Sequence, residues 1–319
     1  MNLNKTYLAG ERYYDEIFEN EIPIMRIDSY DSRIESVKNL LKFDHLEGQK
    51  RFDIENLIAE YSDSFYLKGE KLATTYVIQH TIPTVDDVPV NAKPYRFPHA
   101  LKEELYKQIQ DMLANDIIEP SNSNYQSPVF LVLKGTDDKG NKRYRLVVDF
   151  RHLNDKTIKD KYPLPNILDI IDQVGGSKYF STFDLAQGFY QIPLDPRDRH
   201  KTAFSTSFGL FQFTKMAMGL TSSPATFQRA VARIFKQEIR DKEMFIFIDD
   251  AVVHSKTYEE HIEKLIQFFN RLRESNLKLQ PEKCQLLEEK IIYLGHLLSE
   301  DGVRPDPKQL EAVKLFPIP

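Results

Sequence analysis

Two adjacent carboxylates interrupt an apolar, strand-prone stretch in the C-terminal part of the sequence. Asp249 and Asp250 are the only polar residues between positions 244 and 253. Aspartate is common in turns, so a plain hairpin turn is one interpretation. Turns usually place Gly or Asn beside Asp, and neither is present here. Neighbouring charges between apolar strands are also costly unless a cation compensates them, so a cation site is the second interpretation.

A third carboxylate has a similar setting. Asp184 follows the aromatic-rich run 179–183, which predicts a buried strand. If this strand neighbours the one that precedes Asp249, three carboxylates converge on one edge of a sheet. Oxygen ligands of this kind suit Mg²⁺, with Mn²⁺ as the alternative. Two such ions would support an in-line phosphoryl or nucleotidyl transfer.

The pattern of apolar residues predicts the elements that must position these groups. Spacings of three and four residues predict helices, and alternation or apolar runs around turn residues predict strands. We expect helices at residues 50–61, 99–115, 224–238 and 258–275, a strand at 75–82, and a hairpin at 129–133 and 144–148. Residues 1–45 are polar with weak periodicity, and little structure is expected there. Strands and helices without strict βαβ alternation predict an α+β fold.

Composition narrows the class of protein. The chain has 319 residues with 43 basic and 48 acidic side chains, a net charge of −5, so it lacks the overall basic balance typical of nucleic-acid binders. A local basic cluster nevertheless lies between residues 134 and 161. The single cysteine, Cys284, excludes an intrachain disulfide and any multi-cysteine zinc site. No apolar run is long enough to span a membrane, so an intracellular, cytoplasmic location is expected, with the nucleus as the alternative.

Five segments, in this order along the chain, resemble the motifs of reverse transcriptases, in the style of gypsy-like LTR retrotransposon Pol polyproteins. They are residues 145–154 (RLVVDFRHLN), 180–194 (FSTFDLAQGFYQIPL), 218–228 (MGLTSSPATFQ), 247–250 (FIDD) and 293–299 (YLGHLLS). The resemblance implies a right-hand polymerase fold with fingers, a palm built on an antiparallel sheet, and a thumb that is largely absent. It also implies three parts: a lead-in with a short helix and a strand at 1–90, fingers and palm at 91–298, and the start of a thumb or connector at 299–319.

The function implied by the resemblance is RNA-directed DNA polymerisation by two-metal-ion nucleotidyl transfer. The expected partners are an RNA or DNA template with its primer and deoxynucleoside triphosphates, with no membrane; the sequence leaves the oligomeric state open. The alternative is a catalytically impaired retroelement relic or a co-opted nucleic-acid-binding protein. If the chain ends before the thumb, weak primer extension is expected, with recovery when a thumb is supplied.

The resemblance also assigns roles to individual residues. Asp184, Asp249 and Asp250 would be the catalytic residues and the ligands of two Mg²⁺ ions. The incoming nucleotide would be bound by Lys134, Arg145, Phe189, Met218 and Gly219. Primer and template would be contacted by Phe247, Ile248, Leu294 and Gly295, and Lys283 is a candidate general acid toward pyrophosphate.

Three of these positions depart from the family pattern or carry a competing interpretation. Phe247 replaces the usual tyrosine, which keeps the ring and loses a hydroxyl donor. Lys134 precedes Gly135 where relatives often carry two lysines, so its match is less secure. Periodicity alone predicts that Phe189 is a core residue. The motif instead places it beneath the sugar of the incoming nucleotide.

Overall fold

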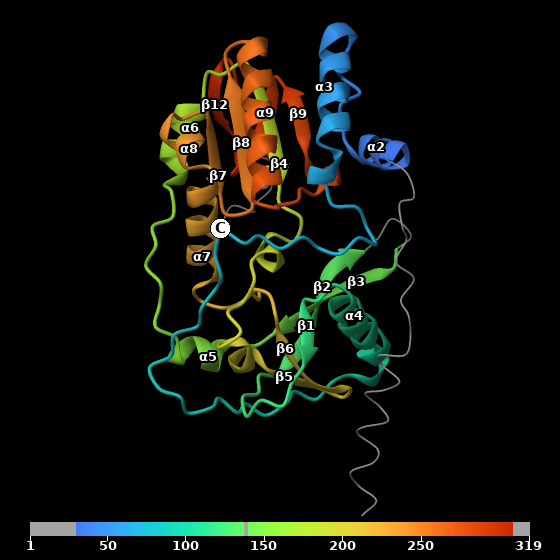
Figure 1. Cartoon of the computed structure of the whole chain (residues 1–319), viewed down its shortest axis with the longest axis vertical. Helices are drawn as coiled ribbons and strands as arrows, with labels where there is room; N and C mark the ends of the chain where they lie inside the picture. The colour runs from blue at the N-terminus through green and yellow to red at the C-terminus, as the bar shows by residue number, and fades with distance from the viewer. Residues whose placement is uncertain (1–29, 137–139, 309–319) are drawn as a thin grey trace, which may run out of the picture.

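Two lobes make up the computed structural model, which describes residues 30–136 and 140–308 (Figure 1). The upper lobe is built on a four-stranded antiparallel sheet of order β7-β8-β4-β9. Its strands are β4 (Tyr179–Asp184), β7 (Met244–Phe247), β8 (Asp250–Ser255) and β9 (Gln285–Glu288). The expected strands on either side of the acidic pair are therefore present, and β8 lies directly beside β4.

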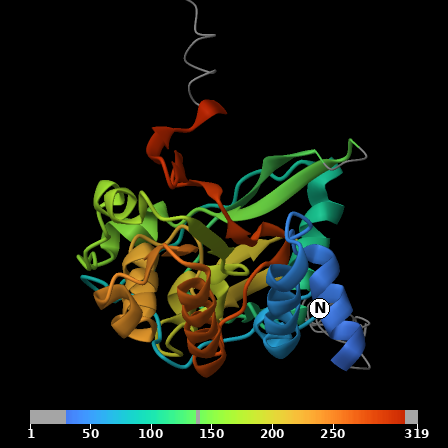
Figure 2. The same cartoon turned by 90° about the horizontal axis from the view of Figure 1, so that it is seen from above.

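Helices cover one face of this sheet. Phe183 points to that face, where its ring centroid lies 4.5 Å from Phe268 and 5.7 Å from Phe269 of α9 (Tyr258–Glu274). Burying each such ring contributes roughly 2–3 kcal/mol. The layer also contains α2 (Tyr30–Leu40), α3 (Gly48–Glu60), α7 (Ser223–Ile234) and α8 (Lys236–Arg240). Seen from above in Figure 2, the orange and blue helices stand along the same side of the molecule.

A second layer packs on the opposite face of the sheet. Phe180, which points to the opposite side of β4 from Phe183, is fully buried in a cluster with Ile170 and Ile291. This layer consists of α6 (Ile167–Val174) and a small antiparallel sheet of β10 (Lys290–Tyr293), β11 (His296–Ser299) and β12 (Gly302–Pro305). Side chains of β4 alternate between the two faces of the sheet and so contribute to two apolar cores. Asp184 is the last residue of this strand.

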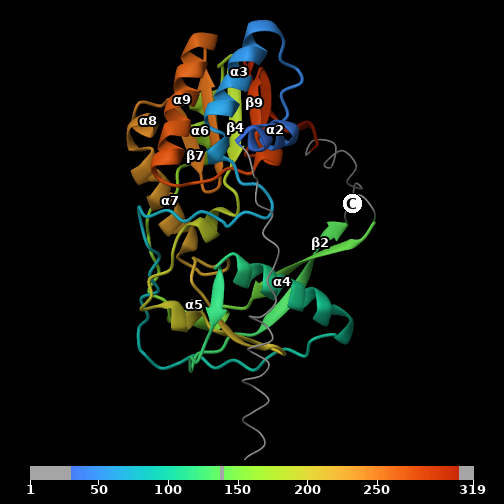
Figure 3. The same cartoon turned by 45° about the vertical axis from the view of Figure 1, so that its right-hand side comes forward.

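The lower lobe has its own core and smaller sheets (Figures 1 and 3). A long hairpin pairs β2 (Val129–Thr136) with β3 (Lys142–Val148), and its register shifts between Leu133 and Gly135. The remaining elements are α4 (Lys102–Ala114), α5 (Arg151–Lys156), and the sheet β1-β6-β5 formed by Ile118–Pro120, Gly209–Phe213 and Phe204–Thr206. Short 3₁₀ turns occur at Ser62–Ser64, His99–Leu101, Gly188–Gln191, Arg199–Thr202 and Pro281–Lys283.

Most predicted elements are confirmed, and the α+β class is correct. The hairpin at 129–148 and the helices near 50–61, 99–115 and 258–275 are present, while the helix expected at 224–238 divides into α7 and α8 at Phe235. Little structure was expected before residue 45, and this is wrong for 30–40, which form α2. Residues 1–29 lie outside the described part of the chain.

The strand predicted at 75–82 is also wrong. The chain bends at residues 76–77, and it forms single contacts instead of a ladder. On the face expected to be apolar, His80 and Ile82 are buried, but Tyr76 is 75% exposed. Thr75 donates to the Gln191 carbonyl and His80 donates to the Pro193 carbonyl, at 2.8 and 2.9 Å. The His80 carbonyl in turn accepts from the Asp195 N–H at 2.9 Å, so the contact at His80 is a single isolated bridge to residue 194. None of the described helices is long and apolar enough to cross a lipid bilayer.

Buried histidines join the layers of the upper lobe. His261 of α9 is fully buried between Ser181 of β4 and Ser255 of β8, with N···O distances of 2.8 and 3.0 Å. Both serines also bond to the backbone, which suits a neutral ring. Burial lowers the pKa of His261 to about 3, and lowers the pKa values of His80 and His254 to about 4.

These histidines predict a loss of stability in mild acid. An unfolded chain protonates them near pH 6.5, whereas the folded chain resists protonation until about pH 4 or below. Their contribution is therefore complete above pH 6.5 and is lost progressively as the pH falls toward 4. Urea unfolding between pH 7.5 and 5 should show a falling free energy of unfolding, and His261→Gln should reduce the slope by about one proton. A slope that this variant leaves unchanged would contradict the assignment.

Candidate active site

The acidic pair lies at the tight hairpin between β7 and β8. Ile248 and Asp249 form the turn, and Ile248 adopts a left-handed backbone conformation with φ of 55°. That conformation is costly for a β-branched residue, and strain of this kind concentrates at functional sites. The stretch is thus both a hairpin turn and an acidic cluster, so the two interpretations of its sequence are not exclusive.

Register decides which carboxylates face each other. Asp250 is paired with Asp184 at the end of the β4–β8 ladder, and the Asp249 carbonyl accepts a hydrogen bond of 3.2 Å from the Leu185 N–H. The sequence predicted that the strand ending at Asp184 and a strand flanking the acidic pair would be neighbours, and β4 and β8 are. The directly opposed residue is Asp250, because Asp249 is taken up by the turn.

The three carboxylates repel one another. Burial, then the charges of Asp184 and Asp250, raise the pKa of Asp249 to about 6. Burial and the Asp184 charge also raise the pKa of Asp250. Within the described chain, the enclosed Asp249 Oδ1 atom has no hydrogen-bond donor. An enclosed carboxylate oxygen without a donor, beside two further carboxylates, fits a divalent cation.

Among the described residues, no three acidic, histidine or cysteine side chains are close enough together to hold a metal ion without further ligands. This does not conflict with a Mg²⁺ site, because Mg²⁺ commonly takes one or two carboxylates and completes its shell with water and substrate phosphates. Asp184 and Asp249 are the residues of this chain that suit the ligand role, with Asp250 beside them.

Phe189 lies next to the acidic hairpin. Its ring packs edge-to-face on Phe227 of α7, with centroids 5.4 Å apart, and the side chain remains partly exposed. Glycine suits the preceding position, since a Cβ at Gly188 would lie 3.2 Å from Asp249 Oδ1 and 3.0 Å from the Phe227 ring, which is tight for a Cβ contact. The 3₁₀ turn Gly188–Gln191 therefore approaches Asp249 closely and presents Phe189 beside it.

The candidate nucleotide-binding residues come from the other lobe. Arg145 on β3 is exposed and paired in register with Val132. Burial raises the pKa of Tyr190 to about 12, and the charge of Arg145 partly opposes this rise, so Arg145 lies within electrostatic range of the turn that carries Phe189. Lys134 is exposed at the register shift of β2. Met218 is partly exposed, and Gly219, with φ of 90°, accepts a 2.8 Å hydrogen bond from the Asn154 amide.

Residues 293–299, which include the expected primer contacts Leu294 and Gly295, lie beside the acidic cluster. The Tyr293 hydroxyl donates to the Asp250 carbonyl at 3.0 Å, and a turn with positive φ at Leu294 and Gly295 follows. Phe247 and Ile248 stand on the acidic hairpin itself. A cavity of about 280 Å³ is lined by Asp184, Asp250, Lys283, Tyr293 and Leu294, among others. The structure thus brings the carboxylates, Lys283 and this segment together, while the hairpin residues Lys134 and Arg145 do not line the cavity.

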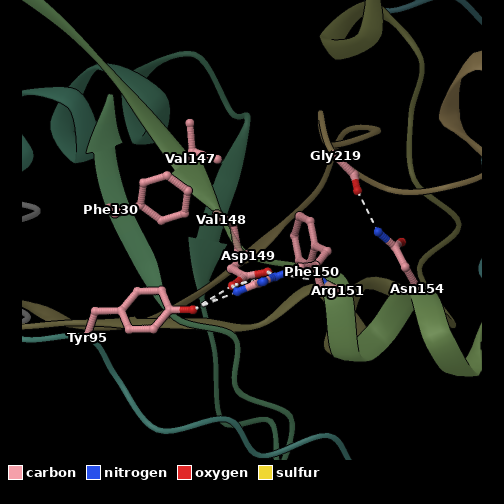
Figure 4. Close-up of a pocket in the computed structure, with 9 residues that line it drawn as sticks. All are labelled: Tyr95, Phe130, Val147, Val148, Asp149, Phe150, Arg151, Asn154 and Gly219. Carbon is pink, nitrogen blue, oxygen red and sulfur yellow. Dashed lines mark hydrogen bonds and ion pairs between the residues drawn. The ribbon is translucent and has the colours of Figure 1, made fainter. Parts of the chain in front are cut away.

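A larger cavity of about 570 Å³ contains residues that the sequence analysis did not select (Figure 4). Arg151 bonds to both oxygens of the buried Asp149, with an Nη2–Oδ2 distance of 2.6 Å, and the Tyr95 hydroxyl donates to the same Oδ2 at 2.6 Å. These bonds hold the pKa of Asp149 well below its usual range. The signal in the sequence is the Asp-x-Arg spacing at 149–151. Tyr95 is 54 residues from Asp149 in the sequence, so no local pattern could reveal the contact between the two side chains.

The upper lobe has an acidic hairpin beside a third aspartate, on an antiparallel sheet covered by helices. The lower lobe has a hairpin with exposed basic residues. This is the arrangement of a polymerase palm and fingers. The family model for "Reverse transcriptase (RNA-dependent DNA polymerase)" matches residues 132–298. The chain therefore belongs to the reverse transcriptase family, which confirms the resemblance inferred from the five motifs.

Individual relatives point the same way. The retrovirus-related Pol polyprotein from transposon 297 of Drosophila melanogaster is 37% identical over 289 residues, covering 89% of this chain and 27% of that protein. The polyprotein from transposon 412 of the same species is 39% identical over 267 residues, covering 83% and 22%. The chain thus spans about a quarter of the length of these curated relatives.

Solved structures confirm the fold. A foamy viral protease–reverse transcriptase, in complex with an RNA/DNA hybrid, superimposes with a TM-score of 0.78 at 19% identity, covering 94% of this chain and 39% of that one. The complex of the foamy viral protein with double-stranded DNA gives 0.79 at 19% identity, covering 94% and 60%. The expected right-hand fold is therefore correct for the described residues.

Proposed function

We propose that this protein is an RNA-directed DNA polymerase that adds deoxynucleotides to a primer 3′-hydroxyl. Its partners in this reaction are an RNA or DNA template with its primer and deoxynucleoside triphosphates. The observation that carries the proposal is the carboxylate cluster, in which Asp249 Oδ1 is enclosed without a donor beside Asp184 and Asp250. A protein that only bound nucleic acid would gain nothing from this costly arrangement.

Asp184 and Asp249 would hold two Mg²⁺ ions, with Asp250 as a supporting carboxylate and Mn²⁺ as the alternative metal. When bound, such ions activate the attacking hydroxyl and neutralise the triphosphate. The chain contributes position: the β4–β8 register and the Leu185–Asp249 hydrogen bond fix the backbone that carries these carboxylates. Preorganised charge of this kind needs no rearrangement at the moment of reaction.

Nucleotide binding is assigned to the hairpin and to the turn below it. The planar guanidinium of Arg145 suits bidentate contact with phosphate, and Lys134 adds a second charge on the same hairpin. Phe189 would pack against the sugar, and Met218 and Gly219 would contact the nucleotide and template. Phe247, Ile248, Leu294 and Gly295 would position the primer. In support, Leu294 lines the cavity that contains Asp184 and Asp250, and Phe247 is paired with Asp250 across the acidic hairpin.

The decisive experiment is extension of a labelled primer on matched RNA and DNA templates with the purified chain. Metal-dependent extension on the RNA template is the expected result. Binding of the template–primer without any extension, in Mg²⁺ and in Mn²⁺, would favour the alternative, a relic or co-opted nucleic-acid-binding protein. The intracellular, cytoplasmic location predicted from composition would place the protein where such templates occur.

Arg151→Gln is expected to weaken binding of a template–primer with a single-stranded overhang by several-fold. Its guanidinium is held by Asp149 and Tyr95 beside the exposed Phe130 ring, a combination suited to phosphate and base contacts. Loss of one phosphate contact should also reduce the slope of log K against log salt by about one. Affinity measured from 50 to 300 mM salt would test both effects.

A matched control is available for this prediction. Arg197 bonds to Asp195 in the same Asp-x-Arg geometry, with an Nη2–Oδ2 distance of 2.7 Å, and does not line the larger cavity. Arg197→Gln removes an equally exposed charge and should leave the salt slope close to that of the wild type. Equal effects of the two variants would show that the cavity has no particular role.

A further inference from the structure

One cation accompanies the three carboxylates of the candidate site. Lys283 Nζ lies 2.7 Å from Asp184 Oδ2, and among the described residues it is the only basic group in an ion pair with Asp184, Asp249 or Asp250. The cluster therefore holds three acidic side chains and a single ammonium group. The contact is made to Asp184, one of the two carboxylates proposed above as metal ligands.

The backbone that carries Lys283 is fixed beside Asp184. The Gln280 N–H donates to the Asp184 main-chain carbonyl at 2.9 Å, and the 3₁₀ turn Pro281–Lys283 follows between the buried residues Pro281 and Cys284. The position of the Lys283 Cα thus depends on main-chain bonds, and it does not require the ion pair.

Apart from its ion pair with Asp184, the Lys283 side chain is mostly exposed to solvent. Its exposed fraction is 62%, against 21% for Asp184. Ion pairs as exposed as this one add little stability, and a lysine side chain has four rotatable bonds. The ammonium can therefore leave the carboxylate at low cost while its backbone stays in place.

We propose that Lys283 is the counter-ion of the carboxylate cluster in the metal-free protein, and that its ammonium must leave Asp184 before this carboxylate can accept a divalent cation. The proposal rests on the proposed function and adds an order of events to it. An oxygen that already accepts a hydrogen bond from an ammonium has a lone pair occupied, and two cations at one carboxylate repel. The same side chain then becomes available as the general acid that the family resemblance implies, because its proton is no longer shared with Asp184.

Lys283→Met removes the charge, keeps the length of the side chain, and should tighten Mn²⁺ binding by about three- to tenfold. The dissociation constant would be measured by electron paramagnetic resonance on the chain without nucleic acid. Lys283→Arg keeps the charge and should bind Mn²⁺ no more tightly than the wild type. Lys290 is the matched control, since it is exposed on the neighbouring strand β10 and, in the described structure, is not paired with any of the three carboxylates. Lys290→Met should leave the affinity unchanged.

A second measurement reports displacement directly. Acetylation of Lys283 by a dilute active ester, followed by mass spectrometry, should become faster when Mn²⁺ is added, while that of Lys290 should not change. Equal Mn²⁺ affinity in wild type and Lys283→Met, or Lys283 labelling that Mn²⁺ leaves unchanged, would overturn the proposal.

The failure of this proposal is distinguishable from failure of the proposed function. Asp184→Asn and Asp249→Asn should each abolish Mn²⁺ binding, so that the signal of free Mn²⁺ remains at full intensity when the protein is added. If they bind Mn²⁺ as the wild type does, the carboxylate cluster is not the metal site and both proposals fail. If they lose binding while Lys283→Met behaves like Lys290→Met, the metal site stands and the counter-ion role of Lys283 is wrong.

Discussion

Asp249→Asn is expected to reduce primer extension on the order of a thousandfold or more while making the folded chain more stable at neutral pH. An amide is a poor ligand for Mg²⁺, so extension should fall to the level of the uncatalysed background. Stability should change in the opposite direction, because the ionised Asp249 is partly buried beside two further carboxylates and has no donor for Oδ1.

The pH dependence of this stability effect has a definite sign. The pKa of Asp249 is about 6 in the folded chain and 3.8 when the chain is unfolded, so the native state binds the proton more tightly. Stability due to this group is present below pH 4 and is lost as the pH rises through 6. Asp249→Asn should therefore melt at a higher temperature than the wild type at pH 7.5, and the difference should shrink toward pH 4.

Single-nucleotide extension and thermal melting, measured on the same preparations, would check both parts. Asp172→Asn is a suitable control, since Asp172 is an exposed acid on α6 in the same lobe. It should retain full activity and show no comparable rise in melting temperature. An Asp249→Asn variant that extends primers normally would remove the basis for the proposed function.

Phe189→Val is expected to raise incorporation of ribonucleotides relative to deoxyribonucleotides by at least about tenfold, an effect of roughly 1.4 kcal/mol. A ring beneath the sugar collides with a 2′-hydroxyl and offers it no hydrogen-bond partner. Overpacking and an unpaired hydroxyl each cost on the order of 1–3 kcal/mol. The structure supports the placement, because Phe189 is only partly buried and the Gly188 backbone beside it approaches Asp249 Oδ1.

The competing interpretation is that Phe189 is a core residue, since its ring also packs on Phe227. Single-turnover incorporation of matched ribo- and deoxyribonucleotides separates the two. Phe189→Leu, which keeps most of the volume, should give a smaller gain in ribonucleotide use than Phe189→Val. Parallel loss of both activities, with unchanged selectivity and a lower melting temperature, would show that Phe189 is structural.

Local patterns were enough to predict the elements near the site and the types of residue that form it. The hairpin strands at 129–133 and 144–148 and the helices near 99–115 and 258–275 follow from turn residues and apolar periodicity, which act over short stretches of chain. The acidic pair at 249–250 was visible because charges between apolar strands are costly. The strand predicted at 75–82 is wrong because alternation of residue types shows neither burial nor whether the backbone has a partner: Tyr76, on the face expected to be apolar, is 75% exposed.

Contacts between residues far apart in the sequence depend on how the elements pack. The β4–β8 register set Asp250 opposite Asp184 and left Asp249 in the turn, and burial by α7 and the Gly188 turn left its Oδ1 without a donor. The ion pair of Lys283 with Asp184, and the bond from Tyr95 to Asp149, likewise join separate segments of chain. These features depend on packing between elements, and burial and register are properties of the folded chain that residue spacing along the sequence does not encode.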